Sequence, residues 1–214
     1  MLDLAFIMKM DVFSKYVREY EEWFERNKFA YLSEIEALKK VVPEGKGLEV
    51  GVGTGRFAEP LGIDYGIDPS ENMLKIAESR GIKTVLGGGE ELPFADNEFD
   101  FVLIAVTICF VDDPDKVIGE AKRVLKNNGK IIIGIIDKNS KLGKIYQNKR
   151  SKSKFYSVAR FYSTGEIIGM LKKCGFKEIK TQQTLFDMPE NLNKIEHPKE
   201  GYGMGGFVVV YGHK

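Results

Sequence analysis

The stretch "LEVGVGTGR", residues 48–56, places three glycines within five positions directly after a short apolar run. Glycine adopts positive φ angles without strain and has no side chain, so such a turn lets the backbone come close to a ligand. The flanking residues decide which ligand fits.

Two common phosphate-binding turns do not match these residues. A P-loop continues with Gly-Lys-Ser/Thr, whereas Gly55 is followed by Arg56. A dinucleotide turn has the pattern G-x-G-x-x-G, and Arg56 occupies its third glycine position. Glu49 stands two residues before the first glycine, where a carboxylate would repel a pyrophosphate at close range. The turn therefore favours a cationic ligand.

A second carboxylate points to the same kind of ligand. Asp68 ends the next apolar run, in "DYGIDPSENM" (64–73), and neighbouring parallel strands end at the same edge of a sheet. Its two acceptor oxygens can bind both hydroxyls of a ribose. S-adenosylmethionine carries a ribose, a sulfonium and an ammonium but no phosphate, so it matches both acids. Asp68 also fits a helix N-cap, with Pro69 first in the helix and Glu71 closing a capping box; the two roles are compatible.

From residue 46 the chain alternates short β-type runs with helical patterns. The β-type runs are 47–50, 64–67, 83–86, 99–106 and 130–136, and the helical patterns are 70–80 and 114–125. This alternation predicts an α/β fold, a doubly wound Rossmann-like sheet with parallel strands and helices on both faces.

Four regions are expected within one domain, 1–214. Residues 1–42 are predicted to be helical, 43–136 to form the ligand-binding core, 137–163 to be a basic insertion, and 164–214 to complete the sheet. The stretch 138–154 has seven basic residues and no acid, which is typical of a solvated loop, with an anionic substrate or RNA as the alternative. After it, Ser163 and Glu166 form a capping box for a helix that ends at Gly175.

Composition narrows the function classes. Of 214 residues, 32 are Lys or Arg and 31 are Asp or Glu, so no global field attracts nucleic acid or an anionic membrane. Cys109 and Cys174 lack C-x-x-C spacing, which favours two reduced thiols over a zinc site. The apolar start "MLDLAFIMKM" is too short for a membrane span and unlike a signal peptide. We expect a soluble, cytoplasmic protein that does not bind membranes.

Four segments resemble, in order and spacing, the motifs of class I S-adenosylmethionine-dependent methyltransferases, in the small-molecule branch. They are "LEVGVGTGRF", "YGIDPSENML", "GGGEELPFADNEFDFVLIAVTICFVDDPDKVIGEAKRVLKNNGKIIIGI" and "GEIIGMLKKCGF". The resemblance implies a seven-stranded, mostly parallel sheet in which the last run, around 207–211, is inserted antiparallel. It also implies that the helical segment 1–42 is a lid.

The same resemblance implies a set of binding residues. The cofactor would be held by Glu49 and the backbone of Gly51, Gly53 and Gly55 at its methionine end, Asp68 at the ribose, Pro69, Met73, Gly89 and Glu90 at the adenine, and the carbonyl of Ala105 at the ammonium. Tyr20 and Trp23 are the candidate substrate-binding residues of the lid, with a purely core role as the alternative. Gly88 stands where many relatives have an acid for the adenine amino group, so Glu90 or Glu91 is the candidate partner.

Methyl transfer from a sulfonium is an in-line displacement that depends chiefly on alignment, so no catalytic acid or base is assigned. No metal site is predicted, because Asp113 in "DDPD" (112–115) fits a helix cap and no other clustered ligands are identifiable. His197 could act as a general base, but its place in the loop before the last strand favours a solvated histidine. The segment "IAVTICF" (104–110) lacks the motifs of DNA methyltransferases, which favours a small-molecule acceptor. Two alternatives stay open: a nicotinamide oxidoreductase, and a non-catalytic S-adenosylmethionine-binding or RNA-associated protein.

Overall fold

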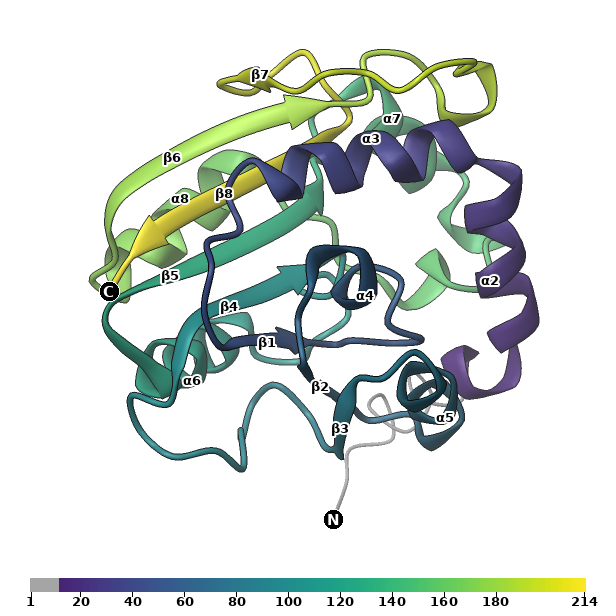
Figure 1. The fold of residues 1–214 in the computed structure, drawn as a ribbon. Helices are drawn as coiled ribbons and strands as arrows, with labels where there is room; N and C mark the ends of the chain where they lie inside the picture. The colour runs from purple at the N-terminus through teal and green to yellow at the C-terminus, as the bar shows by residue number, and fades with distance from the viewer. Residues whose placement is uncertain (1–11) are drawn as a thin grey trace.

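The computed structural model describes residues 12–214, and its strands form one eight-stranded sheet in the order β3-β2-β1-β4-β5-β8-β6-β7 (Figure 1). The strands are β1 (Gly47–Val50), β2 (Tyr65–Asp68), β3 (Lys83–Leu86), β4 (Phe99–Ala105), β5 (Leu125–Ile136), β6 (Lys177–Thr184), β7 (Lys199–Glu200) and β8 (Phe207–His213). The first five are parallel, and β8 lies antiparallel between β5 and β6. The predicted doubly wound sheet with an inserted antiparallel strand is confirmed.

The expected count of seven strands was one short. The additional strand, β7, consists of Lys199 and Glu200, which pair with Gln183 and Gln182 at the edge of the sheet. Both of its residues are exposed. A strand of two exposed, charged residues has no apolar alternation that a sequence pattern could reveal.

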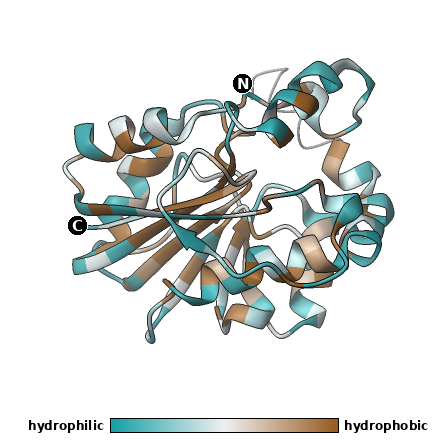
Figure 2. Ribbon diagram, turned by 90° about the horizontal axis from the view of Figure 1, so that it is seen from above, coloured by the Kyte–Doolittle hydropathy of each residue, from teal (hydrophilic) through white to brown (hydrophobic). Residues whose placement is uncertain are grey.

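Helices cover both faces of the sheet, and the apolar strands lie between them (Figure 2). The α-helices include α2 (Val17–Arg26), α3 (Lys28–Lys39), α4 (Ala58–Leu61), α5 (Glu71–Ser79), α6 (Pro114–Val124), α7 (Lys141–Asn148) and α8 (Thr164–Lys173), and the 3-10 turns include η1 (Arg150–Lys152), η2 (Tyr156–Val158) and η3 (Pro189–Asn191). The apolar side chains of α3, α4 and α5 join one core cluster, and those of α6 and α8 join the other. Two buried layers therefore hold the sheet in place.

The N-terminal arm is helical as predicted, with a break at Asn27 between α2 and α3. In Figure 1 this arm bends around the side of the molecule toward which the arrowheads of β4 and β5 point. The stretch "MLDLAFIMKM" lies outside the described residues. Within residues 12–214, every helix is too short or too polar to cross a bilayer.

The structure confirms two of the predicted helix caps and contradicts a third. Asp113 caps α6 by accepting the N–H of Lys116 at 3.0 Å, as predicted. The capping box of α8 is also confirmed. The predicted cap of α5 was wrong: its N-cap is Ser70, while Asp68 is the last residue of β2. The Asp68 carboxylate is therefore not needed to start the helix.

The prediction of a solvated loop for 138–154 was wrong in its first part. Residues Lys141–Asn148 form α7, whose N-cap Ser140 accepts the N–H of Gly143 at 2.9 Å. Leu142 is buried in the core. The basic composition of this stretch suggested a loop, but it is also compatible with a short amphipathic helix. The exposed face of such a helix accommodates lysines while its other face is buried.

The second part of this stretch yields a stability prediction. Lys149, Arg150 and Lys152 are exposed, so their joint replacement by Gln should change the free energy of unfolding by no more than about 0.5 kcal/mol per site. Lys154 pairs with Glu19 at 3.0 Å and its ammonium lies 4.1 Å from the ring centroid of Tyr16. Lys154→Gln should therefore cost more than any of the other three. Denaturant melts of the triple variant and of the four single variants check both statements. A loss above about 1.5 kcal/mol in the triple variant, or a loss in Lys154→Gln no larger than in the other single variants, would contradict them.

Candidate functional site

A cavity of about 460 Å³ opens at the carboxyl ends of the parallel strands. Ligands of open α/β sheets bind at this edge, and the volume is that of a small-molecule site. The wall combines the turn after β1, the end of β2, the turn after β3 and the end of β4 with side chains of α2, α3 and α7. The predicted core and the helical arm thus meet around one cavity.

The glycine turn after β1 needs glycine both for its backbone angles and for the lack of space for a side chain. Gly51, Gly53 and Gly55 all have positive φ, at 73°, 52° and 83°. A Cβ on Gly51 would collide with the Thr107 side chain, and one on Gly55 with Ile82. At Gly53 a Cβ would meet the Tyr20 hydroxyl oxygen at 3.3 Å. Gly51 and Gly53 line the cavity, whereas Gly55 does not, so Gly55 serves the packing behind the turn.

Asp68 links the second strand to this turn. Its Oδ2 accepts the N–H of Gly53 at 2.9 Å, and its Oδ1 accepts the N–H of Ser70 at 2.8 Å. Burial raises the pKa of Asp68 to about 6, and the two hydrogen bonds hold it from rising further. The carboxylate is therefore largely ionised at neutral pH. It lines the cavity with spare lone pairs for further donors.

Glu49 is placed differently from the prediction. It is buried and lies outside the cavity lining. Burial raises its pKa well above the usual range, although it accepts the N–H of Ala58, and the charge of Asp68 raises it further. Its Oε2 has no hydrogen-bond partner among the described residues. A buried oxygen left in this state next to a ligand site fits a donor or a positive charge from the ligand side.

The other predicted cofactor residues are brought together at the cavity wall. These are Pro69, Met73, Gly89, Glu90 and Ala105. Glu90 also accepts the N–H of Asp112 at 3.0 Å. Glu91 is exposed and is not part of the wall, which leaves Glu90 as the acid nearest the predicted adenine region. His197 is exposed and lies outside the wall, as expected for a loop histidine.

Both candidate residues of the lid face the cavity. Tyr20 and Trp23 project from α2 into its wall. The Tyr20 ring packs edge-on against Phe24 and Phe155, at centroid distances of 5.0 and 6.1 Å. Burial, and then the charges of Glu49 and Asp68, raise the pKa of Tyr20, so its hydroxyl keeps its proton. Because this hydroxyl lies beside Gly53, Tyr20 belongs to the end of the cavity formed by the glycine turn.

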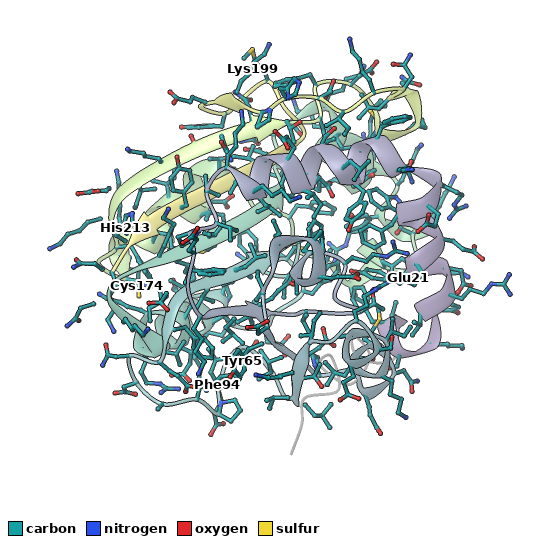
Figure 3. The ribbon with its side chains drawn as sticks, in the orientation of Figure 1. Glu21, Tyr65, Phe94, Cys174, Lys199 and His213 are labelled. Carbon is teal, nitrogen blue, oxygen red and sulfur yellow. The ribbon has the colours of Figure 1, made fainter. Side chains whose placement is uncertain are left out.

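A charged cluster that the sequence did not reveal fixes α2 to the glycine turn. Glu21, labelled in Figure 3, accepts hydrogen bonds from Arg56 Nη2 at 2.6 Å, Arg80 Nη2 at 2.7 Å and Thr54 Oγ1 at 2.5 Å. Burial raises the pKa of Glu21, but these three donors outweigh it and hold the pKa at about 2. Arg56, which disqualified the dinucleotide pattern, thus has a structural partner in the lid.

The part of the cavity formed by α3, α7 and η2, away from the glycine turn and called here its far part, contains further residues that the sequence analysis missed. Glu34 of α3, Tyr146 of α7 and Tyr156 of η2 all line it. Glu34 follows Ala30 and precedes Leu38 by four residues each, and both neighbours are fully buried. An acid in the buried stripe of a helix was the signal that could have found it.

Comparison with known proteins identifies the family. The model of the family "Methyltransferase domain" matches residues 48–133. An uncharacterized protein of Methanocaldococcus jannaschii is 57% identical over 96% of this chain and 100% of its own length. An uncharacterized protein of Mycobacterium tuberculosis is 33% identical over 89% of this chain and 70% of its own length. A crystal structure from Thermotoga maritima, of a SAM-dependent methyltransferase and possible histamine N-methyltransferase, is 52% identical. It covers 95% of this chain and 98% of its own, with a TM-score of 0.94.

The chain belongs to the class I S-adenosylmethionine-dependent methyltransferases. The cofactor of this methyltransferase is S-adenosylmethionine, and the alternative of a nicotinamide oxidoreductase was wrong. The orphaned oxygen of Glu49, the anionic Asp68 and the glycine turn between them suit a cationic, hydroxyl-bearing ligand.

The Glu21 cluster of the methyltransferase leads to a prediction about lid stability. Because the pKa of Glu21 is depressed, its contribution is fully present above the ordinary value of 4.5 and is lost as pH falls toward about 2. Glu21→Gln should lower the free energy of unfolding at pH 7 by about 1–3 kcal/mol, the contribution of hydrogen bonds to a charged group. Urea melts of both proteins at pH 7 and pH 3 measure the difference, which should shrink in acid.

A matched control is Glu22→Gln, one residue along α2. Glu22 pairs only with Arg18, whose side chain is 89% exposed, so this variant should resemble the wild type. Equal losses in the two variants would show that the Glu21 cluster does not fix the lid.

Proposed function

We propose that this methyltransferase transfers the methyl group of S-adenosylmethionine to a nucleophilic atom of a small organic molecule bound in the same cavity. The observation that carries the proposal is the continuity of that cavity. It runs from the glycine turn and Asp68 to apolar and aromatic residues of α2 and α7 and to Glu34 of α3, so cofactor and acceptor can lie in one cavity. A site lined in this way favours a compact organic acceptor over a macromolecule.

The proposed cofactor placement follows the wall residues. Asp68 would accept both ribose hydroxyls, Met73 and Pro69 would flank the adenine, and Gly89 and Glu90 would lie at its edge. The methionine end would lie over Gly51 and Gly53, with Glu49 and the Ala105 carbonyl compensating its positive charges. Tyr20 and Trp23 would close the site from the lid.

A strained residue supports the placement of the methionine end. Val106, directly after β4, has a φ of 52°, which a β-branched residue adopts only at a cost. It lies in the cavity wall between Ala105 and Thr107, and the Thr107 hydroxyl donates to the Ala105 carbonyl at 3.0 Å. A strained residue of this kind in a cavity wall supports a functional role for the end of β4, which is where the ammonium contact is proposed.

The bound cofactor supplies an electrophilic methyl group on a sulfonium. The chain itself has to align the acceptor atom with that methyl and keep water away. Residues of α2, including Tyr20, Trp23 and the buried Phe24, cover the cavity, and the Glu21 cluster holds α2 against the turn. Alignment of two bound reactants provides a large part of the acceleration in such a reaction.

Turnover tests the proposal directly. The purified protein, incubated with S-adenosylmethionine and a panel of small amines, phenols, thiols and carboxylic acids that includes histamine, should form S-adenosylhomocysteine with at least one acceptor. Mass spectrometry of the acceptor should show the added methyl group. Tight cofactor binding without turnover on any panel member would instead favour a non-catalytic role.

The proposed role of Asp68 is tested by Asp68→Asn. The variant keeps the size of the side chain but loses its charge, and hydrogen bonds to a charged group contribute about 1.5–3 kcal/mol. The dissociation constant for S-adenosylhomocysteine should therefore rise by about 10- to 150-fold in calorimetric titration. Glu71→Gln, on the exposed first turn of the following helix α5, should leave it unchanged. Unchanged binding by Asp68→Asn would mean that Asp68 only organises the turn through Gly53 and Ser70.

A further inference from the structure

The far part of the cavity contains a buried acid that the proposed cofactor does not use. Glu34 is only 3% exposed, yet it lines the cavity. Its carboxylate has no hydrogen bond and no ion pair with any of residues 12–214. Native structures do not leave a buried carboxylate uncompensated without a reason, because its desolvation is costly.

The acid lies apart from the cofactor residues. Burial raises the pKa of Glu34 to about 8. Glu34 belongs to α3, whereas the wall residues of the proposed cofactor site come from the carboxyl ends of β1 to β4, the turns after them and α5. The side chains that the charge of Glu34 influences are Tyr146 and Tyr156, in addition to Tyr31 of its own helix. Glu34 therefore belongs to the acceptor end of the cavity.

Aromatic rings surround this end. The rings of Tyr146 and Tyr156 lie 4.8 Å apart between centroids, and Phe110 stacks on Tyr156 at 6.2 Å with an interplanar angle of 17°. Phe24 and Trp23 of α2 contribute further apolar surface. Ring faces attract cations, and a carboxylate among aromatic rings is the arrangement that recognises an ammonium group.

The other charged residues of the cavity wall are compatible with a cationic ligand at Glu34. The cavity is lined by four acids, Glu19, Glu34, Asp68 and Glu90, and by two basic residues, Arg26 and Lys154. Lys154 is paired with Glu19 at 3.0 Å, and Arg26 is exposed and donates to the Glu22 carbonyl at 3.3 Å. Neither basic residue of the wall forms an ion pair with Glu34.

We propose that Glu34 binds the protonated nitrogen of an organic amine substrate, whose apolar body packs against the rings of Tyr146, Tyr156 and Trp23. The proposal rests on the proposed function, since it names the substrate class of the same cavity. Glu34 acts here as a binding residue. The energetic reason is mutual: the amine supplies the charge that the buried carboxylate lacks, and the carboxylate supplies the acceptor that a desolvated ammonium requires.

Three probes of nearly equal shape isolate the charge. Phenethylamine, phenethyl alcohol and phenylacetate are titrated into the wild-type protein saturated with S-adenosylhomocysteine, with benzylamine and tyramine as amines of other lengths. At least one amine should bind about 10- to 100-fold more tightly than its neutral counterpart, and phenylacetate more weakly than either. Glu34→Gln should abolish the preference for the amine and leave the affinity for the alcohol unchanged.

Proton release provides a second readout. Because burial raises the pKa of Glu34 to about 8, the ligand-free carboxyl is largely protonated at pH 7 and must ionise when the cation binds. Binding should therefore release a proton, and the calorimetric enthalpy at pH 7 should depend on the buffer. Burial raises the pKa of Tyr31 to about 12 and the pKa values of Tyr146 and Tyr156 well above their usual range, so none of these phenols contributes. In Glu34→Gln the buffer dependence should disappear.

Thermal melts of the same samples check that the variants are folded. Glu34→Gln removes an uncompensated buried acid, so its melting temperature at pH 8 should be no lower than that of the wild type. Glu36→Gln, on the same helix but outside the cavity wall, should behave as wild type in every titration.

The outcomes separate the two proposals. Failure of the wild type to bind S-adenosylhomocysteine would overturn the proposed function. Normal binding of S-adenosylhomocysteine with no amine preference, with a preference for phenylacetate, or with an amine preference that survives Glu34→Gln would overturn the role of Glu34 alone.

Discussion

Three carboxylates at or beside one cavity have no cationic partner among the described residues: Glu34 and Glu49 are buried, and Asp68 is half-buried. The rest of this structure depends on how these three groups are compensated. Asp68 has two backbone N–H donors, Glu49 has one, and Glu34 has no donor from residues 12–214. Burial raises the pKa of all three. Such an arrangement costs folding free energy and is relieved by positively charged ligands. The same constraint therefore links the cofactor end of the cavity to its acceptor end.

The helical arm contains one acid that is compensated by donors and one that is not. Glu21 of α2 is fully compensated by Arg56, Arg80 and Thr54, and its depressed pKa shows that it stabilises the folded protein. Glu34 of α3 is uncompensated, and its raised pKa shows that ionisation costs folding free energy. One acid fastens the arm to the glycine turn, and the other stays available to a ligand. An arm held by ion pairs at one end can cover the cavity and still offer a polar anchor inside it.

Local sequence patterns were sufficient to predict that the glycine turn and Asp68 lie together at one edge of the sheet. Glycine spacing, an acid in β1 and an acid at the end of β2 are all local features, and parallel pairing of β1 with β2 brings them together without help from distant segments. The same locality explains the success with most strands and with the caps of α6 and α8. The sequence named Asp68 as the cap before α5, but the N-cap is Ser70, because both residue types can accept a helix N–H and the local pattern does not distinguish them.

The sequence by itself determined the fold class, the position of the glycine turn and the family of this methyltransferase. Tertiary structure alone decided which acids are compensated and which are not. Glu21 of the lid forms ion pairs with Arg56 and Arg80. Glu34 lies in the same cavity wall as Tyr146 and Tyr156, which follow it by more than a hundred residues in the chain, and its charge influences both. The physical reason is that a carboxylate's free energy depends on the donors, charges and water around it. Those surroundings come from segments that only the folded chain brings together.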